Sequence, residues 1–213
     1  NPPPGGMILL FLAGLCGAVY SAGSQEDCQF HLKPGGEAIA VALANASQRS
    51  CPDTVVYLAA GEYRGERNTK LGTRALAAVM SGGAGVALSI IGAGAGATTL
   101  DGGGTSWLLR SSGSDALNLF NLTIARGFSN HSIMSAVSVT GRANFTATGV
   151  HFDGCRKATE GISYPPPFGG GALLLKTAGA VALLDCSFTG NHASNTGGAV
   201  FVNAADLVGV SAP

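Results

Sequence analysis

The chain has 213 residues, enough for one domain of ordinary size, and its 12 basic and 12 acidic residues cancel. Only 11% of the residues are charged, which excludes the basic surface that a nucleic-acid binder or a polybasic lipid-binding segment needs. The 33 glycines disfavour long helices, and short runs of Val, Thr, Phe and Leu favour strands joined by tight turns.

The first 23 residues are predicted to be a secretory leader. Residues 7–19 are almost wholly apolar, which is too short a run to span a bilayer, and small residues suited to cleavage follow. The start lacks a basic segment, so the alternative is an apolar helix packed on the domain. No other segment is apolar for long enough to predict a membrane span, and we expect a secreted or cell-surface protein without a transmembrane helix once the leader is removed.

Residues 24–53 are predicted to form an N-terminal segment with a capping helix over 36–47, because alanines alternate there with Ile39, Val41 and Leu43. Cys28 and Cys51 flank this segment and are expected to form a disulfide. Cys155 and Cys186 are a second candidate pair, although Cys186 also suits a buried apolar thiol. The chain has no C-x-x-C motif, so no zinc site is expected.

Two strands are predicted next, over 54–58 and 86–91. The second is followed by residues 92–97, which read G-x-G-x-x-A and formally match a dinucleotide-binding fingerprint. That fingerprint must open a helix, whereas the glycine-rich residues 98–104 cannot sustain one. We therefore predict a glycine-rich corner between strands, with no cofactor and no metal.

A repeated layout then dominates the chain. Leu108 lies 16 residues before Ile124, Ala136 lies 16 before Phe152, and Ala172 lies 16 before Phe188. Residues 199–202 begin a fourth copy, and the starts are 28, 36 and 27 residues apart. A unit of this length, stacked on itself, is typical of a solenoid.

Within the repeat, the segments 117–124, 145–152 and 181–188 align without a gap. Alternation of apolar and polar residues indicates half-buried strands, and one turn-forming position interrupts the alternation in each copy. The predicted inward sets are Leu117, Phe145 and Val181; Leu119, Ala147 and Leu183; Leu122, Val150 and Cys186; and Ile124, Phe152 and Phe188. The turn position holds Asn121, Gly149 and Asp185. Since one copy cannot bury its own apolar face, we predict parallel strands stacked over 54–213, with the last unit incomplete at Pro213.

These segments resemble a known fold family. Residues 56–64, 91–102 and 119–124 resemble the opening, second and standard rungs of right-handed parallel β-helix proteins of the pectate-lyase-like superfamily. The GGA-apolar stretches at 170–173 and 197–200, with the FxxN stretch at 188–191, also resemble the polymorphic outer-membrane protein repeat. The resemblance implies an all-β, single-stranded right-handed solenoid. It says little about activity, because this fold carries lyases, hydrolases, esterases, adhesins and passive scaffolds.

The polygalacturonase-like and pectin-esterase-like motifs are absent, and the carboxylates needed for a calcium site do not gather, because Asp153 and Asp185 occupy different columns. The best local catalytic candidates are His151 and Asp153, two residues apart on one outward face, with Arg126 one unit away. The alternative interpretation is a solvated polar face.

Four Asn-x-Ser/Thr sequences are candidate glycosylation sites. Their asparagines are Asn45, Asn130, Asn144 and Asn121. Asn121 ranks below Asn130 and Asn144, because it falls at a predicted tight turn where its side chain can bond to the backbone.

From these features we expect a secreted or cell-surface module with a binding or structural role, with polysaccharide or other surface glycans as partners or an adhesin-like role. The alternative is a polysaccharide lyase or hydrolase whose active site lies mostly outside this chain.

Overall fold

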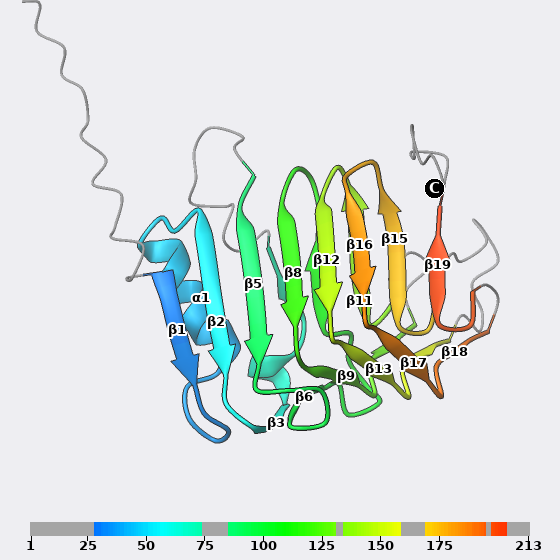
Figure 1. Ribbon diagram of the computed structural model, residues 1–213, viewed down its shortest axis with the longest axis horizontal. Coiled ribbons are helices and arrows are strands. Elements are labelled where there is room, and N and C mark those ends of the chain that lie inside the picture. Colours follow the sequence, from blue (N-terminus) through cyan, green and yellow to red (C-terminus); the bar gives the residue numbers. More distant parts are fainter. Residues whose placement is uncertain (1–27, 74–84, 131–133, 159–168, 195–196, 204–213) are drawn as a thin grey trace, which may run out of the picture.

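The computed structural model describes residues 28–73, 85–130, 134–158, 169–194 and 197–203, so the predicted leader lies outside the described residues. The described part is predominantly β-structure, and every strand pair in it is parallel. None of its helices combines the length and the apolar character needed to traverse a bilayer. The strands gather in sheets that are stacked in a manner compatible with a solenoid (Figure 1).

The largest sheet, which we call sheet A, lies along the front of the molecule in Figure 1. Its strands, in spatial order, are β1 (Gln29–Leu32), β2 (Asp53–Leu58), β5 (Ala87–Gly92), β8 (Ala116–Phe120), β12 (Asn144–Thr148) and β16 (Val181–Leu184). Spatial order and chain order agree, so each later passage of the chain adds one strand to the same edge.

Three smaller sheets complete the fold. Sheet B contains β3 (Gly61–Arg64), β6 (Thr98–Asp101), β9 (Thr123–Ala125), β13 (His151–Asp153) and β17 (Ser187–Thr189). Sheet C contains β4 (Leu71–Gly72), β7 (Leu109–Ser111), β11 (Val137–Gly141), β15 (Leu173–Thr177) and β19 (Val200–Val202). Sheet D contains β10 (Phe128–Ser129), β14 (Arg156–Lys157) and β18 (His192–Ala193). The chain visits sheets A, B and C repeatedly in this order, and we call one such passage a circuit.

The strand register confirms the alignment predicted from the repeat. Phe152 pairs with Ile124 on one side and with Phe188 on the other. In sheet A, Phe145 likewise lies between Leu117 and Val181. Equivalent residues of successive circuits are therefore direct neighbours across the parallel ladders.

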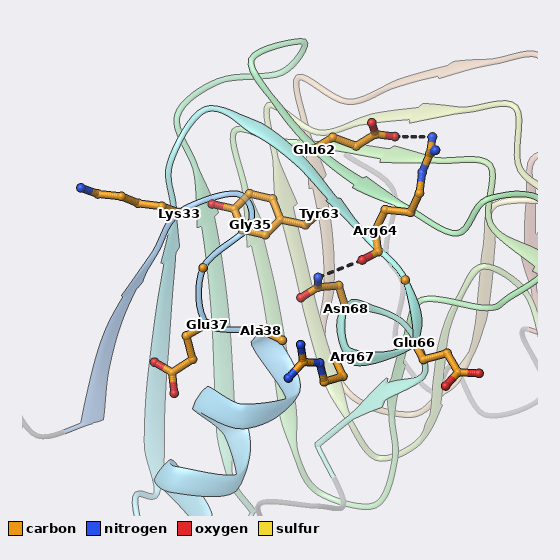
Figure 2. Close-up of a pocket in the computed structure, with 12 residues that line it drawn as sticks. Lys33, Gly35, Glu37, Ala38, Glu62, Tyr63, Arg64, Glu66, Arg67 and Asn68 are labelled. Atoms are coloured by element: carbon orange, nitrogen blue, oxygen red, sulfur yellow. Dashed lines mark hydrogen bonds and ion pairs between the residues drawn. The ribbon is translucent and has the colours of Figure 1, made fainter.

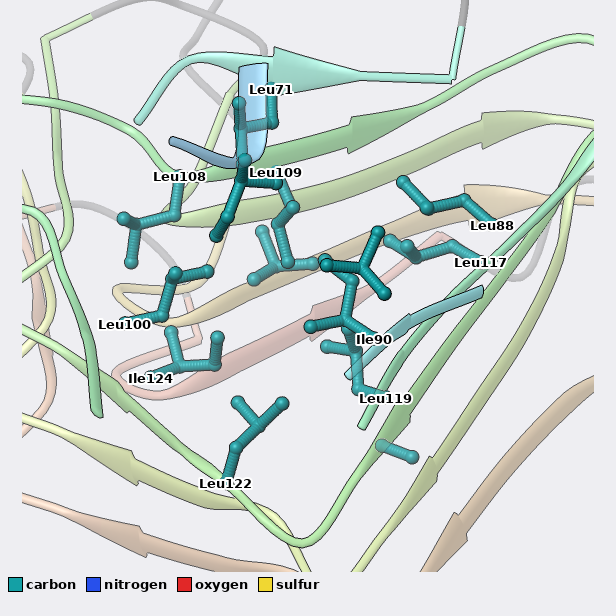
Figure 3. Close-up of a cluster of buried hydrophobic side chains, with 14 of the residues drawn as sticks. Leu71, Leu88, Ile90, Leu100, Leu108, Leu109, Leu117, Leu119, Leu122 and Ile124 are labelled. Atoms are coloured by element: carbon teal, nitrogen blue, oxygen red, sulfur yellow. The ribbon is translucent and has the colours of Figure 1, made fainter. Parts of the chain in front are cut away.

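The apolar core lies between the sheets (Figure 3). Leu117 and Leu119 point into it from sheet A, Leu100 and Ile124 from sheet B, and Leu109 from sheet C. All five side chains are at most 1% exposed. Each sheet thus contributes inward side chains to one shared interior. A single circuit cannot bury its own apolar face, so it needs this interior to be stable.

The predicted turn between sheets A and B is present in each of the three aligned circuits. Asn121 and Asp185 adopt left-handed φ values of 52° and 51°, and Gly149 has φ 63° at the same position. Asn and Asp tolerate this conformation better than most residues because their short side chains can bond locally. The turn-forming residues thus mark the corner at which the chain leaves sheet A for sheet B.

The N-terminal segment contains α1 (Ile39–Gln48), which confirms the predicted helix with its start three residues later. The helix buries Ile39, Ala42, Leu43 and Ala46 against the core. Cys28 and Cys51 form the expected disulfide and tie the start of β1 to the end of this segment. The glycine-rich stretch after β5 leads into strand β6 and not into a helix, in agreement with the predicted corner.

The inward side chains of one circuit, that of β16 and β17, are less covered than predicted. Val181 and Leu183 are 38% and 36% exposed, and Phe188 is only partly buried. The strands that carry them, β16 and β17, each pair on one side only within the described residues. The side chains therefore keep the predicted inward position but lack a further described layer over them.

Lys157 is a buried lysine, with a relative exposure of only 1%. Its Nζ donates a hydrogen bond to the Met134 carbonyl oxygen, and burial lowers its pKa from 10.5 to about 8. The unfolded chain then binds more protons than the folded chain between about pH 8 and 10.5, because the folded pKa lies below the unfolded one.

We expect the free energy of unfolding to rise by about 3 kcal/mol as the pH increases across this window, from the size of the pKa difference. Lys157→Met removes the titrating group while keeping an unbranched side chain, so its stability should not share this rise. Chemical denaturation of both proteins at several pH values measures the difference. Parallel pH profiles for the two proteins would contradict the assignment.

Candidate functional site

Charged side chains gather on the outer face of sheet B. Glu62 and Arg64 come from β3, Asp101 ends β6, and Arg126 follows β9 directly. Arg64 and Asp101 are direct partners in the parallel register, so the fold itself brings their side chains together. Arg126 reaches the same place from the next circuit with a left-handed backbone, φ 47°, which is uncommon for a residue other than glycine. We call these four residues the ion cluster.

Asp101 is the centre of the ion cluster and is fully buried. Its Oδ1 accepts hydrogen bonds from the Gly103 amide at 2.8 Å and from Arg126 Nε at 3.0 Å. Its Oδ2 accepts from Arg64 Nε at 2.8 Å and also pairs with the Nη2 atoms of Arg64 and Arg126. Glu62 Oε1 binds the same two guanidinium groups, at 2.6 Å from Arg64 and 3.0 Å from Arg126.

Burial opposes ionisation of Asp101 and by itself raises its pKa. Hydrogen bonds that Asp101 accepts from Arg126, the Gly103 amide and Arg64 outweigh burial and hold the pKa well below its ordinary value. Asp101 is therefore a carboxylate at neutral pH, and two cations face two anions. A cluster with such matched charges is suited to joining three circuits, and it offers no proton donor or acceptor near neutral pH.

The structure does not assemble the predicted trio of His151, Asp153 and Arg126. His151 Nδ1 lies 2.5 Å from Ser187 Oγ on the next circuit. Arg126 directs its guanidinium to Asp101 and Glu62, one and two circuits back, and meets Asp153 only through its backbone amide, which donates to the Asp153 carbonyl oxygen at 2.9 Å. His151 and Asp153 share a strand, as predicted, without any described contact between their side chains.

A pocket of about 630 Å³ opens beside the ion cluster (Figure 2). It lies between the loop that precedes α1, strand β3 and the short helix η2 (Glu66–Asn68). Its charged lining residues are Lys33, Glu37, Glu62, Arg64, Glu66 and Arg67. We call it the polar pocket, and its volume falls within the range of about 300–1,000 Å³ that small-molecule sites occupy.

The side chains of the polar pocket differ in how far they are already engaged. Asn68 accepts the Ile39 amide at 3.0 Å and donates to the Arg64 carbonyl oxygen at 3.0 Å, so it holds α1 against η2. Glu37 accepts a hydrogen bond from Asn45. Arg67 is exposed, and its guanidinium lies between Ala38 and Asn68 in Figure 2. Arg67 therefore has donors available to a ligand, whereas Asn68 does not.

Among the described residues, the cysteines outside the disulfide, Cys155 and Cys186, are both free thiols, so the second candidate pair is not formed. The circuit offset places Cys155 beside Asn191, whose Oδ1 accepts the Cys155 amide at 2.9 Å, and not beside Cys186. Burial raises the pKa of Cys155 to about 12, so it is a thiol at neutral pH. Cys186 is partly buried and packs against the core, in agreement with the alternative interpretation.

The four candidate glycosylation asparagines differ in exposure. Asn130, Asn144 and Asn121 are exposed, whereas Asn45 is half-buried and its Nδ2, the atom to which a glycan would attach, donates to Glu37 Oε1 at 3.1 Å. Asn144 keeps its amide nitrogen available, because the described bond of its side chain is made by Oδ1, which accepts the Ala180 amide. Glycosylation itself stays a prediction.

No functional role was predicted from the sequence for Glu62, Arg64 or Asp101. Asp101 accepts the Gly103 amide, but the two guanidinium groups are its main partners. The signal lay in the resemblance of residues 56–64 and 91–102 to successive rungs, because the strand register then pairs Arg64 with Asp101. No set of three His, Cys, Asp or Glu side chains placed to hold a metal ion occurs among the described residues.

Comparison of the chain with protein-family models, with curated proteins and with solved structures finds no match. The class that the structure defines is therefore a β-protein of stacked parallel sheets, with a disulfide-tied N-terminal segment.

Proposed function

We propose that this chain is a secreted or cell-surface right-handed β-helix module that binds glycans through the polar pocket. Secretion is supported by the leader pattern and by the disulfide between Cys28 and Cys51, since such bonds persist in oxidising compartments. Right-handed winding is supported by the general preference of parallel strand connections, which are right-handed in about 98% of cases.

The polar pocket is the observation that carries the proposal. Most small-molecule sites are lined mainly by apolar side chains, whereas six of the twelve residues around this pocket are charged. Their charges balance as three cations and three anions, so the lining favours a ligand rich in hydrogen-bonding groups over a strongly charged one. A sugar offers many hydroxyl groups that both donate and accept, and guanidinium and carboxylate groups bind such pairs of hydroxyls.

A catalytic site within the described residues has less support. The predicted acid–base residues do not come together there, and the ion cluster is saturated by its own partners. We therefore place binding ahead of bond cleavage. Release of unsaturated uronide from polysaccharide substrates by the purified protein would reverse that order.

We expect Arg67→Ala to weaken glycan binding about tenfold, because a hydrogen bond to a charged group contributes about 1.5–3 kcal/mol. The experiment is a glycan array followed by isothermal titration calorimetry with the glycans retained. Lys176→Ala is the matched control, since Lys176 is an exposed cation on β15 outside the pocket. The proposal would be contradicted if no glycan on the array bound the protein, or if the two variants bound the glycans with equal affinity.

A further inference from the structure

The outer face of sheet A carries a stripe of apolar and aromatic side chains. The parallel register places His31, Tyr57, Ile91 and Phe120 side by side on four neighbouring strands. We call these four residues the outer stripe. Strands of one sheet lie about 4.8 Å apart, so the stripe runs for about 14 Å across the strands. None of the four side chains is fully buried, and none of them contributes to the core.

The N-terminal end of the outer stripe is hollowed. The rings of His31 and Tyr57 stack with centroids 4.6 Å apart and planes within 7° of each other. A second pocket, of about 360 Å³, lies beside this pair, and Ile91 and Lys33 also line it. Lys33 lines the polar pocket as well, so the two hollows meet at this residue.

A second column of the same face is uncharged and mostly polar. Gln29, Ser89, Asn118 and Thr146 stand at equivalent positions of their strands, two residues before the outer stripe, and Val55 lies between Gln29 and Ser89. Asn118 Nδ2 donates to Ser89 Oγ at 3.2 Å, which fixes the amide along the sheet. Amide and hydroxyl groups thus run parallel to an apolar stripe, and neither of the two columns holds a carboxylate, a lysine or an arginine.

We infer that the outer stripe is a second subsite, which binds a neutral, extended polysaccharide lying across the strands and ending in the polar pocket. This inference rests on the proposed function and names its ligand class. Pyranose rings with equatorial hydroxyls have apolar faces and a polar rim. The faces match the aromatic and aliphatic side chains of the stripe, and the rim matches the neighbouring amide and hydroxyl column.

Because Lys33 lines both subsites, the length of an oligosaccharide determines which of them it occupies. A short oligosaccharide fills the polar pocket alone, whereas a longer one passes Lys33 and reaches Tyr57 and Ile91. The added contacts belong to one ligand, so they increase its affinity without a second loss of translational freedom. Beyond Lys33, neither column offers a lysine or an arginine to compensate for the desolvation of a carboxylate, so a uronate chain of equal length gains less along the stripe.

The test is isothermal titration calorimetry with β-1,4-linked gluco-oligosaccharides, using the disaccharide and the hexasaccharide. We expect the hexasaccharide to bind the unaltered protein at least about tenfold more tightly than the disaccharide. Tyr57→Ser and, independently, Phe120→Asn should remove this advantage while leaving disaccharide affinity unchanged. Thr189→Ala, on the outer face of sheet B, is the control, and circular dichroism establishes which variants are folded.

The outcomes separate the two proposals. If neither oligosaccharide binds, and the glycan array is also silent, the proposed function fails. If the oligosaccharides bind without an advantage of length, or if both folded stripe variants keep that advantage, the second subsite fails and the polar pocket stands. A hexauronate that binds as tightly as the neutral hexasaccharide overturns the assignment of a neutral ligand.

Discussion

Replacing Phe152 with alanine should lower the free energy of unfolding by about 3–5 kcal/mol, the range measured for large aromatic side chains removed from cores. Phe152 is fully buried, and its ring stacks on that of Phe188 with centroids 4.8 Å apart and planes within 4°. Ile124 covers its other side in the strand register. The substitution therefore leaves a cavity between two circuits and removes contacts on both sides.

Phe188→Ala is the matched control for this prediction, because it removes the same side chain from the same column. Phe188 is only partly buried, so its loss should cost clearly less than that of Phe152. Urea denaturation followed by circular dichroism gives both values. Equal losses, or a loss below about 1 kcal/mol for Phe152→Ala, would mean that Phe152 does not occupy a closed interior.

The substitution Asp101→Asn should cost about 2–3 kcal/mol, because it removes a buried carboxylate on which two guanidinium groups converge. The two arginines are about half exposed and can turn to water, which keeps the loss below that of a fully buried ion pair. The replacement amide keeps the size of the side chain but also presents N–H donors to the arginine donors. The ion cluster is thus expected to lose both charge and hydrogen bonding.

Asp153→Asn is the control, since Asp153 occupies the same column of sheet B one strand beyond Ala125. The pH dependence gives a second readout. The folded pKa of Asp101 lies below the unfolded value of 3.8, so its contribution is complete above about pH 4 and is lost as the pH falls further. The stability difference between the unaltered protein and Asp101→Asn should therefore shrink in acid. A difference independent of pH would contradict the assigned ionisation.

The register of the fold could be predicted from the sequence because apolar periodicity determines it. Ile124, Phe152 and Phe188 were aligned from spacing alone, and the strand pairs confirm the alignment. A shift by one residue would expose every inward side chain of a strand, so the pattern tolerates only one register. The turn position could also be predicted from the sequence, because few residue types other than Gly, Asn and Asp accept its left-handed backbone readily, and Asn121 and Asp185 occupy it.

The ion cluster could not be predicted in the same way. Arg126 lies at a turn of the backbone, and the direction of its long side chain decides which carboxylate it binds. The spacing of residues along the chain does not predict that direction. Asp153 was the expected neighbour, yet the guanidinium turns back toward Asp101. The polar pocket was equally hidden, since it joins β3 to residues before α1 and in η2, which are not part of the repeated layout.

The functional account depends on this arrangement of circuits. The polar pocket and the outer stripe both lie at the N-terminal end, where α1, β1 and the Cys28–Cys51 disulfide hold the first circuits in place. The stripe exists only if β1, β2, β5 and β8 are in the described register, because a shift by one residue would turn its side chains inward. Both binding proposals therefore require that equivalent residues of successive circuits are neighbours.

Nuclear Overhauser spectroscopy tests that requirement most directly. The account predicts cross-peaks between the ring protons of Phe152 and Phe188, and between the Phe152 ring and the methyl groups of Ile124. Residues 28 or 36 positions apart in the chain meet in this way only when successive circuits stack in the described register. A spectrum of the folded protein in which Phe152 contacts neither residue would contradict the account.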